Sequence, residues 1–272
     1  MPELPEVETV RRGLSARLLG HRLAAVSVRQ PVLRWPVPVQ LARRLRGRRL
    51  DSVERRGKYL LLDFAGARLL LHLGMSGRLS VLSRVAPPGP HDHVDFRFDD
   101  GRCLRFHDPR RFGCVLLLDG GGGHPLLDGL GPEPLSDAFT AVYLYARTRN
   151  RCAAIKSVLM DARVVAGVGN IYASESLHRA GVRPARAAGR LAPADCRRLV
   201  AAVRTVLSEA IAQGGTTLTD SAFAGTDGSF GDFQQQLAVY DREGKPCPRC
   251  GTAVRRVVIG QRSSYYCPRC QR

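Results

Sequence analysis

The pattern of apolar and polar positions predicts a helix near the start of the chain, over residues 3–19. Its apolar residues recur at spacings of three and four and so share one stripe: Val7, Val10, Leu14 and Leu18. Glutamates and Pro5 occupy the first turn and Gly20 follows the last apolar position, which is typical of the two ends of a helix. One face of this helix is therefore expected to lie against a core.

Between residue 21 and about residue 118 the apolar runs become short and strand-like. Turns rich in glycine, proline and aspartate separate these runs, which read LAAVSV, KYLLLDF, RLLLHL, HVDFRF and CVLLL. This spacing favours a β-sandwich or barrel. The next stretch, roughly 119–137, is rich in glycine and proline without clear periodicity, so we expect the linker between two domains there.

Helical spacing returns in the second half of the chain. Asn170 stands where an N-cap would begin a helix running to Gly181, and a further helix is expected over 195–211. The segment of about 214–236 is rich in Gly, Thr, Ser and Asp and breaks the helical pattern, so we expect a long functional loop there. We predict three parts: a domain with a helix and a β-sandwich over 1–130, a helical domain over 131–236 and a small C-terminal part over 237–272.

The chain carries a large excess of basic residues. Its 272 residues include 42 Lys and Arg against 24 Asp and Glu, a formal net charge of +18. The positive charges repel one another, which costs free energy unless a polyanion binds, so nucleic acid is the favoured partner. Charge alone is also compatible with a generally basic or ribosome-associated protein. The N-terminus lacks a secretory signal pattern and no apolar run approaches the roughly 18 residues that would span a bilayer, so we expect a cytoplasmic protein.

Half of the eight cysteines form two CxxC pairs near the C-terminus. Thiolates at this spacing can converge on one Zn²⁺ ion, and the predicted ligands are Cys247, Cys250, Cys267 and Cys270. Four thiolates leave no open coordination position, so we expect one structural zinc per chain without a hydrolytic role. The residues between the pairs alternate as in a β-hairpin, whose Arg255, Arg256 and Arg262 make it a candidate DNA-binding finger. A zinc-finger DNA-binding protein without enzymatic activity fits these features as well.

A second arrangement that could hold a metal is formed by His91, His93 and Asp95, which alternate along one predicted strand. Histidine and carboxylate ligands on one strand face would suggest a metal-dependent nuclease or hydrolase. Phe96 stands where an HxHxDH site would have its last histidine, and the sequence shows no second ligand cluster. This alternative is therefore the weaker one.

Six segments of the chain, in this order, resemble the bacterial formamidopyrimidine-DNA glycosylase family. They are MPELPEVET at the N-terminus, LLLHLGMSG at 69–77, HDHVD at 91–95, DPRRFG at 108–113, LMDARVVAGVGNIYASES at 159–176 and the paired cysteines. The resemblance implies an α+β multidomain fold: an N-terminal helix with a β-sandwich, a helical helix-two-turn-helix domain and a β-hairpin zinc finger. It also implies a monomeric base-excision-repair enzyme that acts on double-stranded DNA containing oxidised purines or abasic sites.

The resemblance implies covalent chemistry at the N-terminus. Removal of the initiator methionine would leave Pro2 with a free secondary amine, and a terminal amine of pKa about 8 is less fully protonated at neutral pH than a lysine. In the family this amine displaces the damaged base and forms a Schiff base that leads to β and δ elimination. The resemblance assigns proton transfer to Glu3 with support from Glu6, and catalytic roles to Lys58 and Arg262. Without it, the two glutamates would simply be acids that offset the helix dipole.

The resemblance also implies a set of DNA contacts. Extruding a base requires side chains that fill the gap, and the implied wedge is Met75, Arg110 and Phe112. Glycine or proline flanks the two loops that carry these residues, which favours exposed tips over core packing. Further contacts, mainly to phosphates, are expected from His72, His91, Arg111, Arg151, Lys156, Asn170 and Tyr240.

The sequence leaves the preferred lesion open. Several family members carry an aromatic residue after TLxD and the tripeptide GYF, where this chain has Ser221 and GDF. Candidates for base recognition in this segment are Thr217, Ser221 and residues 230–233. A related enzyme that removes oxidised pyrimidines is the main alternative. Those relatives typically begin MPEGPE, whereas this chain has Leu4, and the DPRRFG segment also favours the purine branch.

Overall fold

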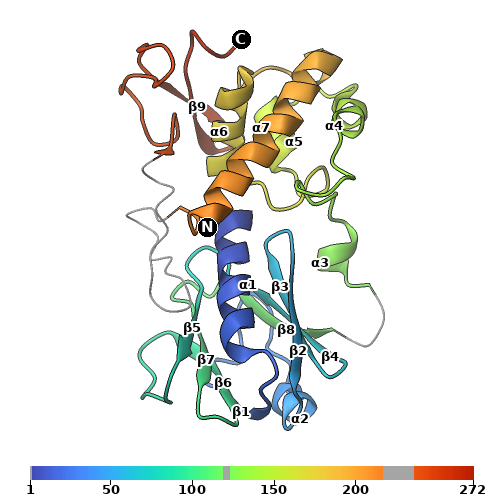
Figure 1. Cartoon of the computed structure of the whole chain (residues 1–272), viewed down its shortest axis with the longest axis vertical. Coiled ribbons are helices and arrows are strands. Elements are labelled where there is room, and N and C mark those ends of the chain that lie inside the picture. Colours follow the sequence, from blue (N-terminus) through green and yellow to red (C-terminus); the bar gives the residue numbers. More distant parts are fainter. Residues whose placement is uncertain (1, 119–122, 217–235) are drawn as a thin grey trace. The chain divides into compact units, whose positions relative to one another are not determined.

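The structure is a computed structural model that describes residues 2–118, 123–216 and 236–272. The chain divides into two compact units (Figure 1). Unit 1 comprises Met1–Leu127 and Gln213–Gln234, and unit 2 comprises Asp128–Ala212 and Gln235–Arg272. Within the described ranges, no helix combines the length and the apolar character that a membrane span requires.

Unit 1 begins with the predicted helix, α1 (Leu4–Leu18), drawn in blue in Figure 1. Glu3 is the N-cap residue and has an extended backbone. Pro5 is tolerated in the first turn because the N–H that it lacks would have no helical partner there. The predicted apolar stripe is confirmed, since its members are at most 1% exposed: Val7, Val10, Leu14 and Leu18.

Eight strands follow and form two antiparallel sheets of four. The first sheet has the order β1 (Leu23–Val28), β6 (Asp92–Phe98), β7 (Cys103–His107) and β5 (Arg78–Leu82). The second has the order β2 (Leu50–Arg56), β3 (Tyr59–Phe64), β4 (Ala67–His72) and β8 (Cys114–Leu118). Both sheets and α1 contribute side chains to one core, as shown by Leu14, Leu62 and Phe106. This arrangement confirms the predicted β-sandwich.

Two short helices were not expected from the sequence. Helix α2 (Leu41–Leu45) spans only five residues, too few to show a helical period. Leu41 and Leu45, four positions apart, are both fully buried and anchor α2 to the core of unit 1. Helix α3 (Pro125–Asp128) falls inside the expected linker, of which residues 119–122 lie outside the described residues.

Unit 2 is helical and ends in a hairpin. Its helices are α4 (Ala141–Thr148), α5 (Ile155–Met160), α6 (Asn170–Ala180), the short 3₁₀ helix η1 (Ala188–Arg190) and α7 (Pro193–Ala212). Gly181 ends α6 in the left-handed conformation that glycine adopts without strain. The N-cap of α6 is Gly169, so the prediction of Asn170 as the cap was wrong by one residue: Gly169 is extended, whereas Asn170 is already helical. Strands β9 (Arg255–Ile259) and β10 (Arg262–Tyr266) form the predicted antiparallel hairpin.

Candidate functional site

The start of α1 gathers three members of the predicted catalytic set. Pro2 is buried, and Glu3 and Glu6 are each 3% exposed. The carboxylate of Glu6 accepts hydrogen bonds on both oxygens, on Oε2 from the backbone N–H of Glu3 and on Oε1 from that of Thr216, each at 2.8 Å. Because both partners are backbone donors, the Glu6 carboxylate acts as an acceptor that fixes the backbone carrying Glu3.

Gly215 allows the chain to approach Glu6 this closely. Its φ is +85°, which favours glycine, and a Cβ at this position would lie 2.8 Å from Glu6 Oε1. The hydrogen bond from Thr216 to Glu6 joins residues 210 positions apart. No local pattern in the sequence predicts such a contact. Segment 217–235 follows directly, so the candidates Thr217, Ser221 and residues 230–233 lie outside the described residues.

Lys58 lies in the short turn between β2 and β3, and an ion pair ties this turn to α1. Arg55 Nη1 donates to the carbonyl oxygen of Gly57 at 3.1 Å, and Arg55 Nε donates to Glu8 of α1 at 3.1 Å. Arg11 donates to the same carboxylate at 2.9 Å. Burial alone would raise the pKa of Glu8, but the hydrogen bonds from Arg11 and Arg55 outweigh it and hold the pKa below its ordinary value. No pattern in the sequence singles out Glu8 or Arg55.

His72, the last residue of β4, is held as a neutral imidazole. Burial, followed by the positive charges of Lys58 and Arg34, lowers the pKa of His72 to about 4. Its Nδ1 accepts a hydrogen bond from the backbone N–H of Gly74 at 3.0 Å, which leaves Nε2–H as the donor. His72 can therefore offer a phosphate one hydrogen bond without adding charge.

The two loops that carry the predicted wedge residues pack closely against each other. Ser76 Oγ donates to Asp108 Oδ1 at 2.7 Å and accepts from the backbone N–H of Arg110 at 3.3 Å. Gly74 has a φ of +62°, and a Cβ there would lie 2.5 Å from the backbone nitrogen of Gly113. Only glycine therefore permits this approach of the two backbones.

The close packing of these loops brings Met75, Arg110 and Phe112 to neighbouring positions of unit 1. Met75 is half-buried, whereas the ring of Phe112 is 43% exposed. The guanidinium of Arg110 lies 4.7 Å from the centre of that ring, a cation–π distance. An exposed aromatic ring beneath a cation is unlike core packing, and the role of these residues as a wedge stays a prediction.

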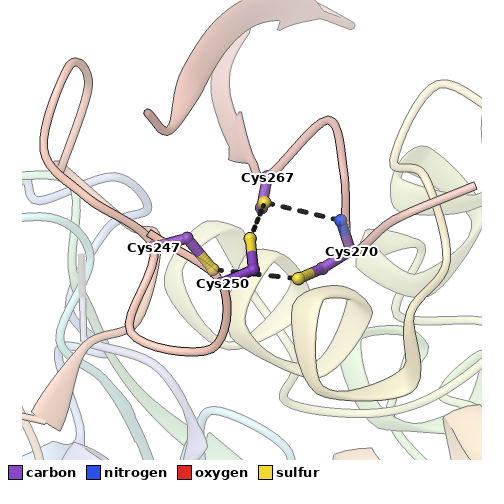
Figure 2. A group of neighbouring side chains, drawn as sticks. All are labelled: Cys247, Cys250, Cys267 and Cys270. Carbon is purple, nitrogen blue, oxygen red and sulfur yellow. Dashed lines mark hydrogen bonds between the residues drawn. The ribbon is translucent and has the colours of Figure 1, made fainter. Parts of the chain in front are cut away.

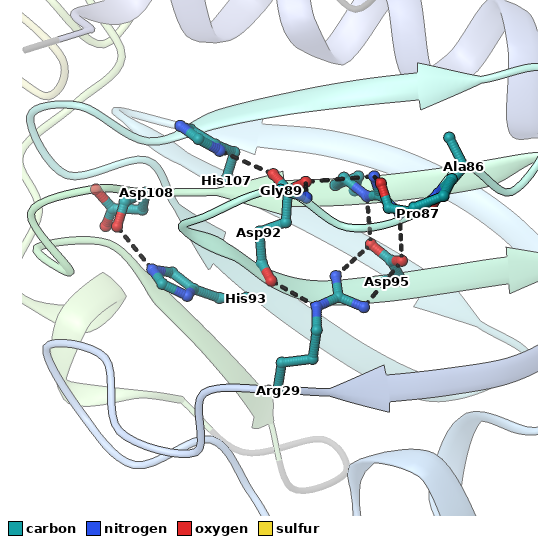
Figure 3. Close-up of polar contacts among 10 residues, drawn as sticks. Arg29, Ala86, Pro87, Gly89, Asp92, His93, Asp95, His107 and Asp108 are labelled. Atoms are coloured by element: carbon teal, nitrogen blue, oxygen red, sulfur yellow. Dashed lines mark hydrogen bonds and ion pairs between the residues drawn. The ribbon is translucent and has the colours of Figure 1, made fainter.

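The HDHVD segment forms a network of ion pairs instead of a metal site (Figure 3). Asp95, which is 3% exposed, pairs with Arg29 and with Arg105, each at 2.8 Å. His93 Nε2 lies 2.8 Å from the backbone oxygen of Asp108. Across the part of the chain that the structure describes, the histidines and aspartates of this segment do not form a group of metal ligands. The nuclease alternative therefore has no support here.

A cavity of about 430 Å³ borders this network. His91 and Arg111, two predicted phosphate contacts, line it together with Arg29 and Gln30. Both predicted contacts are exposed, and both have a positive φ, 72° for His91 and 55° for Arg111. Conformations of this kind cost free energy in residues other than glycine, and they are often found where side chains serve a ligand.

In unit 2, Asn170 and Tyr240 lie side by side. Asn170 Nδ2 donates to the hydroxyl of Tyr240 at 3.4 Å, and Asn170 Oδ1 is buried without a partner among the described residues. The carboxylate of Glu175 in α6 accepts from the backbone N–H groups of Ala238, Val239 and Tyr240 at 2.9, 3.0 and 2.7 Å. Burial raises the pKa of Glu175, and the three donors oppose that rise. Glu175, which the sequence analysis missed, thus fixes Tyr240 relative to α6.

Lys156 is not at the surface where a phosphate contact was expected. It is 1% exposed, and its Nζ donates to the carbonyl oxygen of Ser263 at 3.0 Å and to Ser264 Oγ at 2.7 Å. A buried ammonium group needs such partners, so Lys156 secures β10, and its predicted phosphate contact stays a prediction. Arg151 is half-buried, and Arg262 is exposed at the first position of β10.

The four cysteines of the CxxC pairs converge on one point in unit 2 (Figure 2). Their sulfur atoms all lie within 4.8 Å of one another, with 3.9 Å between those of Cys247 and Cys270 and 3.5 Å between those of Cys250 and Cys267. Zn–S bonds of about 2.3 Å in a tetrahedron place sulfur atoms about 3.8 Å apart, so the set fits Zn²⁺. The predicted structural zinc site is confirmed.

Three family models match successive parts of the chain. The formamidopyrimidine-DNA glycosylase N-terminal domain matches residues 1–115, the H2TH domain of the same family matches residues 130–222, and the zinc finger found in FPG and IleRS matches residues 244–272. Curated relatives match over the full length. The chain is 58% identical to the formamidopyrimidine-DNA glycosylase of Thiobacillus denitrificans and 59% identical to that of Thioalkalivibrio sulfidiphilus, and each comparison covers 100% of both chains.

Solved structures match the fold as closely. MutM (Fpg) from Thermus thermophilus is 44% identical with a TM-score of 0.90, over 99% of this chain and 98% of that chain. Lactococcus lactis Fpg in complex with DNA containing an abasic site is 32% identical with a TM-score of 0.91, over 99% of each chain. The same Lactococcus lactis protein has also been crystallised with DNA containing an oxidised pyrimidine.

Proposed function

Because the chain belongs to the formamidopyrimidine-DNA glycosylase family, we propose that Pro2, Glu3, Glu6, Lys58 and Arg262 form its catalytic set. The protein is a base-excision-repair DNA glycosylase with AP lyase activity, and its substrate is double-stranded DNA containing oxidised purines or abasic sites. The observation that carries the assignment of residues is the start of α1, where Pro2 and two carboxylates are buried together. We place this activity, carried out by a monomer, in the bacterial cytoplasm at the nucleoid.

The first step is attack by the amine of Pro2 on C1′ of the extruded nucleotide. The N–C1′ bond forms while the bond from C1′ to the base breaks, and the base leaves with the electron pair of that bond. The amine then loses its proton, Glu3 donates a proton to O4′ as the sugar ring opens, and the nitrogen lone pair closes the iminium. Glu6 positions Glu3 during this step, because both of its oxygens are occupied by backbone donors.

Strand scission follows from the iminium. The iminium acidifies the proton at C2′, and loss of this proton breaks the C3′–O bond. Loss of a second proton then breaks the C5′–O bond and leaves a one-nucleotide gap. Lys58 and Arg262 bind the flanking phosphates, and Arg262 donates the proton to the group that leaves in the second elimination. Zinc supplies no step of this chemistry; held by the four cysteines, it shapes the hairpin that carries Arg262.

We assign the remaining predicted residues to DNA binding. Met75, Arg110 and Phe112 fill the gap that the extruded base leaves. We assign phosphate contacts to His72, His91, Arg111, Arg151, Lys156, Asn170 and Tyr240. Lys156 is the buried member of this set. The division into domains over 1–130, 131–236 and 237–272 remains a proposal of the same kind.

Borohydride trapping tests the covalent step. Reduction in the presence of a duplex with 8-oxoguanine should link protein to DNA, and mass spectrometry of the digested adduct should place the sugar remnant on Pro2. Pro2→Gly should strongly slow strand scission, and Glu3→Gln should lower the rate by about 10²- to 10⁴-fold, the usual contribution of one acid or base. Glu54→Gln, on an exposed carboxylate of β2, is the matched control.

Two results would contradict the proposal: a remnant on Lys58 instead of Pro2, or a Pro2→Gly variant that cuts abasic DNA at the wild-type rate. The choice of lesion needs its own comparison, since a relative has been crystallised with an oxidised pyrimidine. Duplexes with an oxidised purine or an oxidised pyrimidine, opposite each of the four bases, should show faster excision of the purine. Equal or faster excision of the pyrimidine would favour the sister activity.

A further inference from the structure

His178, in the last turns of α6, is a buried polar residue that the proposed chemistry does not use. It is 3% exposed, and its Nε2 lies 3.3 Å from Sγ of Cys247. Burying a polar ring costs free energy unless the ring is hydrogen bonded, and an apolar side chain would fill the same space at lower cost. The position of His178 beside a zinc ligand therefore indicates a specific hydrogen bond.

The chemistry of the metal site fixes the direction of that hydrogen bond. A thiolate that binds zinc carries no proton and can only accept, so the proton must reside on Nε2 of His178. Such a donor draws charge from the sulfur and restrains the Cys247 side chain. Hydrogen bonds to metal ligands are known to orient those ligands and to tune the affinity of the site.

The second cysteine pair is tied to the chain just after the same helix. Gln271 Oε1 accepts from the backbone N–H of Cys267 at 2.8 Å, and Gln271 Nε2 donates to the carbonyl oxygen of Val182 at 2.9 Å. The end of α6 and the residues after it thus contact both cysteine pairs. His178 provides the side-chain contact to the first pair, and Gln271 provides the link to the second.

We propose that His178 is a positioning residue of the zinc site: its Nε2–H donates to the Cys247 thiolate, holds that ligand in place and slows the loss of zinc. His178 is not a ligand itself, because four thiolates already complete the tetrahedral shell. The proposal rests on zinc binding by the cysteines and not on the catalytic set, so its tests need no DNA. Its failure would leave the proposed glycosylase mechanism untouched.

Variants of the full-length protein test the hydrogen bond. His178→Phe keeps a ring but removes the donor, whereas His178→Gln keeps an N–H donor. His124→Gln is the control, at a histidine of unit 1 that lies outside the groups of described residues that could hold a metal. Competition with a chromogenic chelator should show that the phenylalanine variant binds zinc about 10- to 100-fold more weakly. In the cobalt-substituted protein its thiolate-to-metal charge-transfer band should move to longer wavelength, because the sulfur gains charge. The glutamine variant should recover part of both effects, and the control should match the wild type.

Two outcomes of the measurements on the His178 variants would overturn the proposal. One is an unchanged affinity and an unchanged cobalt band in His178→Phe. The other is weaker binding with an unchanged band and no recovery in His178→Gln, which would mean that the ring only fills space. A wild-type cobalt spectrum with a nitrogen ligand would also overturn it, because His178 would then belong to the coordination shell.

A measurement on the unaltered sequence covers the case in which the phenylalanine variant does not fold. The protein is loaded with a spin-active cadmium isotope, and its histidines are labelled with spin-active nitrogen. A hydrogen bond from Nε2–H to the metal-bound sulfur should produce a scalar coupling between the His178 proton and cadmium. Folded, cadmium-loaded protein that lacks this coupling would contradict the proposal.

Discussion

The zinc hairpin and the start of α1 hold their side chains in place by different means. All four cysteines lie within one stretch of chain, and Cys247 is 23 positions from Cys270. At the start of α1, Glu6 depends on the backbone of Thr216, which is 210 positions away. Short-range spacing is therefore enough to encode the metal site, whereas the buried carboxylates require the whole of unit 1 to be folded.

The two regions also differ in where their stability arises. The hairpin is small, and its cysteine pairs gain most of their order from the ion that they share. The start of α1 instead relies on hydrogen bonds from the protein itself, to a carboxylate that is almost fully buried. Replacing one zinc ligand and replacing one buried carboxylate should therefore change stability by different amounts, and in different units of the protein.

The largest effect is expected from Cys250→Ser. Structural zinc contributes about 10 to 16 kcal/mol to the folding of zinc-finger peptides, so loss of one thiolate should leave the hairpin unfolded and without zinc. Unit 1 should keep its fold, because its core contains no residue of the hairpin. Atomic emission should report a zinc content near zero, and amide resonances from β9 and β10 should collapse to unfolded positions.

Cys152→Ser is the matched control, since Cys152 is exposed and lies outside the cluster. It should retain one zinc per chain and an intact hairpin. If the Cys250→Ser protein still held one zinc per chain with native hairpin resonances, the ion would not be what orders this region.

This contrast explains what the sequence could predict. The helical stripe of α1, the alternating strands of the sandwich and the CxxC spacing are local patterns, and the structure confirms each of them. Helix α2 escaped because five residues carry no readable period, and Asn170 was misplaced by one residue because a glycine can cap a helix as well.

Local sequence patterns predict less of the candidate site than of the fold. Glutamates in the first turn of a helix are ordinary, and only the family resemblance singled out Glu3 and Glu6 as catalytic. The burial of Lys156 could not be predicted, because a lysine is usually at the surface and its partners in β10 lie more than a hundred positions away. Glu8, Arg55 and Glu175 went unnoticed for the same reason, since their roles are set by tertiary contacts.

A smaller effect is expected from Glu6→Gln, which tests the long-range side of the comparison. An amide keeps one acceptor oxygen but places an NH₂ group against a backbone N–H, so one hydrogen bond to a charged group is lost. The cost should be about 1.5 to 3 kcal/mol in the unfolding free energy of unit 1. Trp35 is the only tryptophan of the chain and lies in unit 1, so its fluorescence during urea unfolding reports on this unit.

Glu54→Gln serves as the control because its carboxylate is largely exposed, and its change should stay within about 0.5 kcal/mol. Zinc content should remain at the wild-type level in both variants. A Glu6→Gln protein as stable as this control would show that the contact from Thr216 to Glu6 does not hold the start of α1.

The smallest effect is expected from Glu8→Gln, and its sign depends on pH. Arg11 and Arg55 hold the pKa of Glu8 below its ordinary value of 4.5, so the folded state favours the ionised form. The stabilisation is fully present above pH 4.5 and is lost as the pH falls through the lowered folded-state pKa. At neutral pH the variant should be less stable by about 1 kcal/mol, since the pair is only partly shielded from solvent. Urea unfolding followed by Trp35 should show this difference shrinking towards zero as the pH drops below 4.5, and a difference that grows on acidification would contradict the ion pair between α1 and the Lys58 turn.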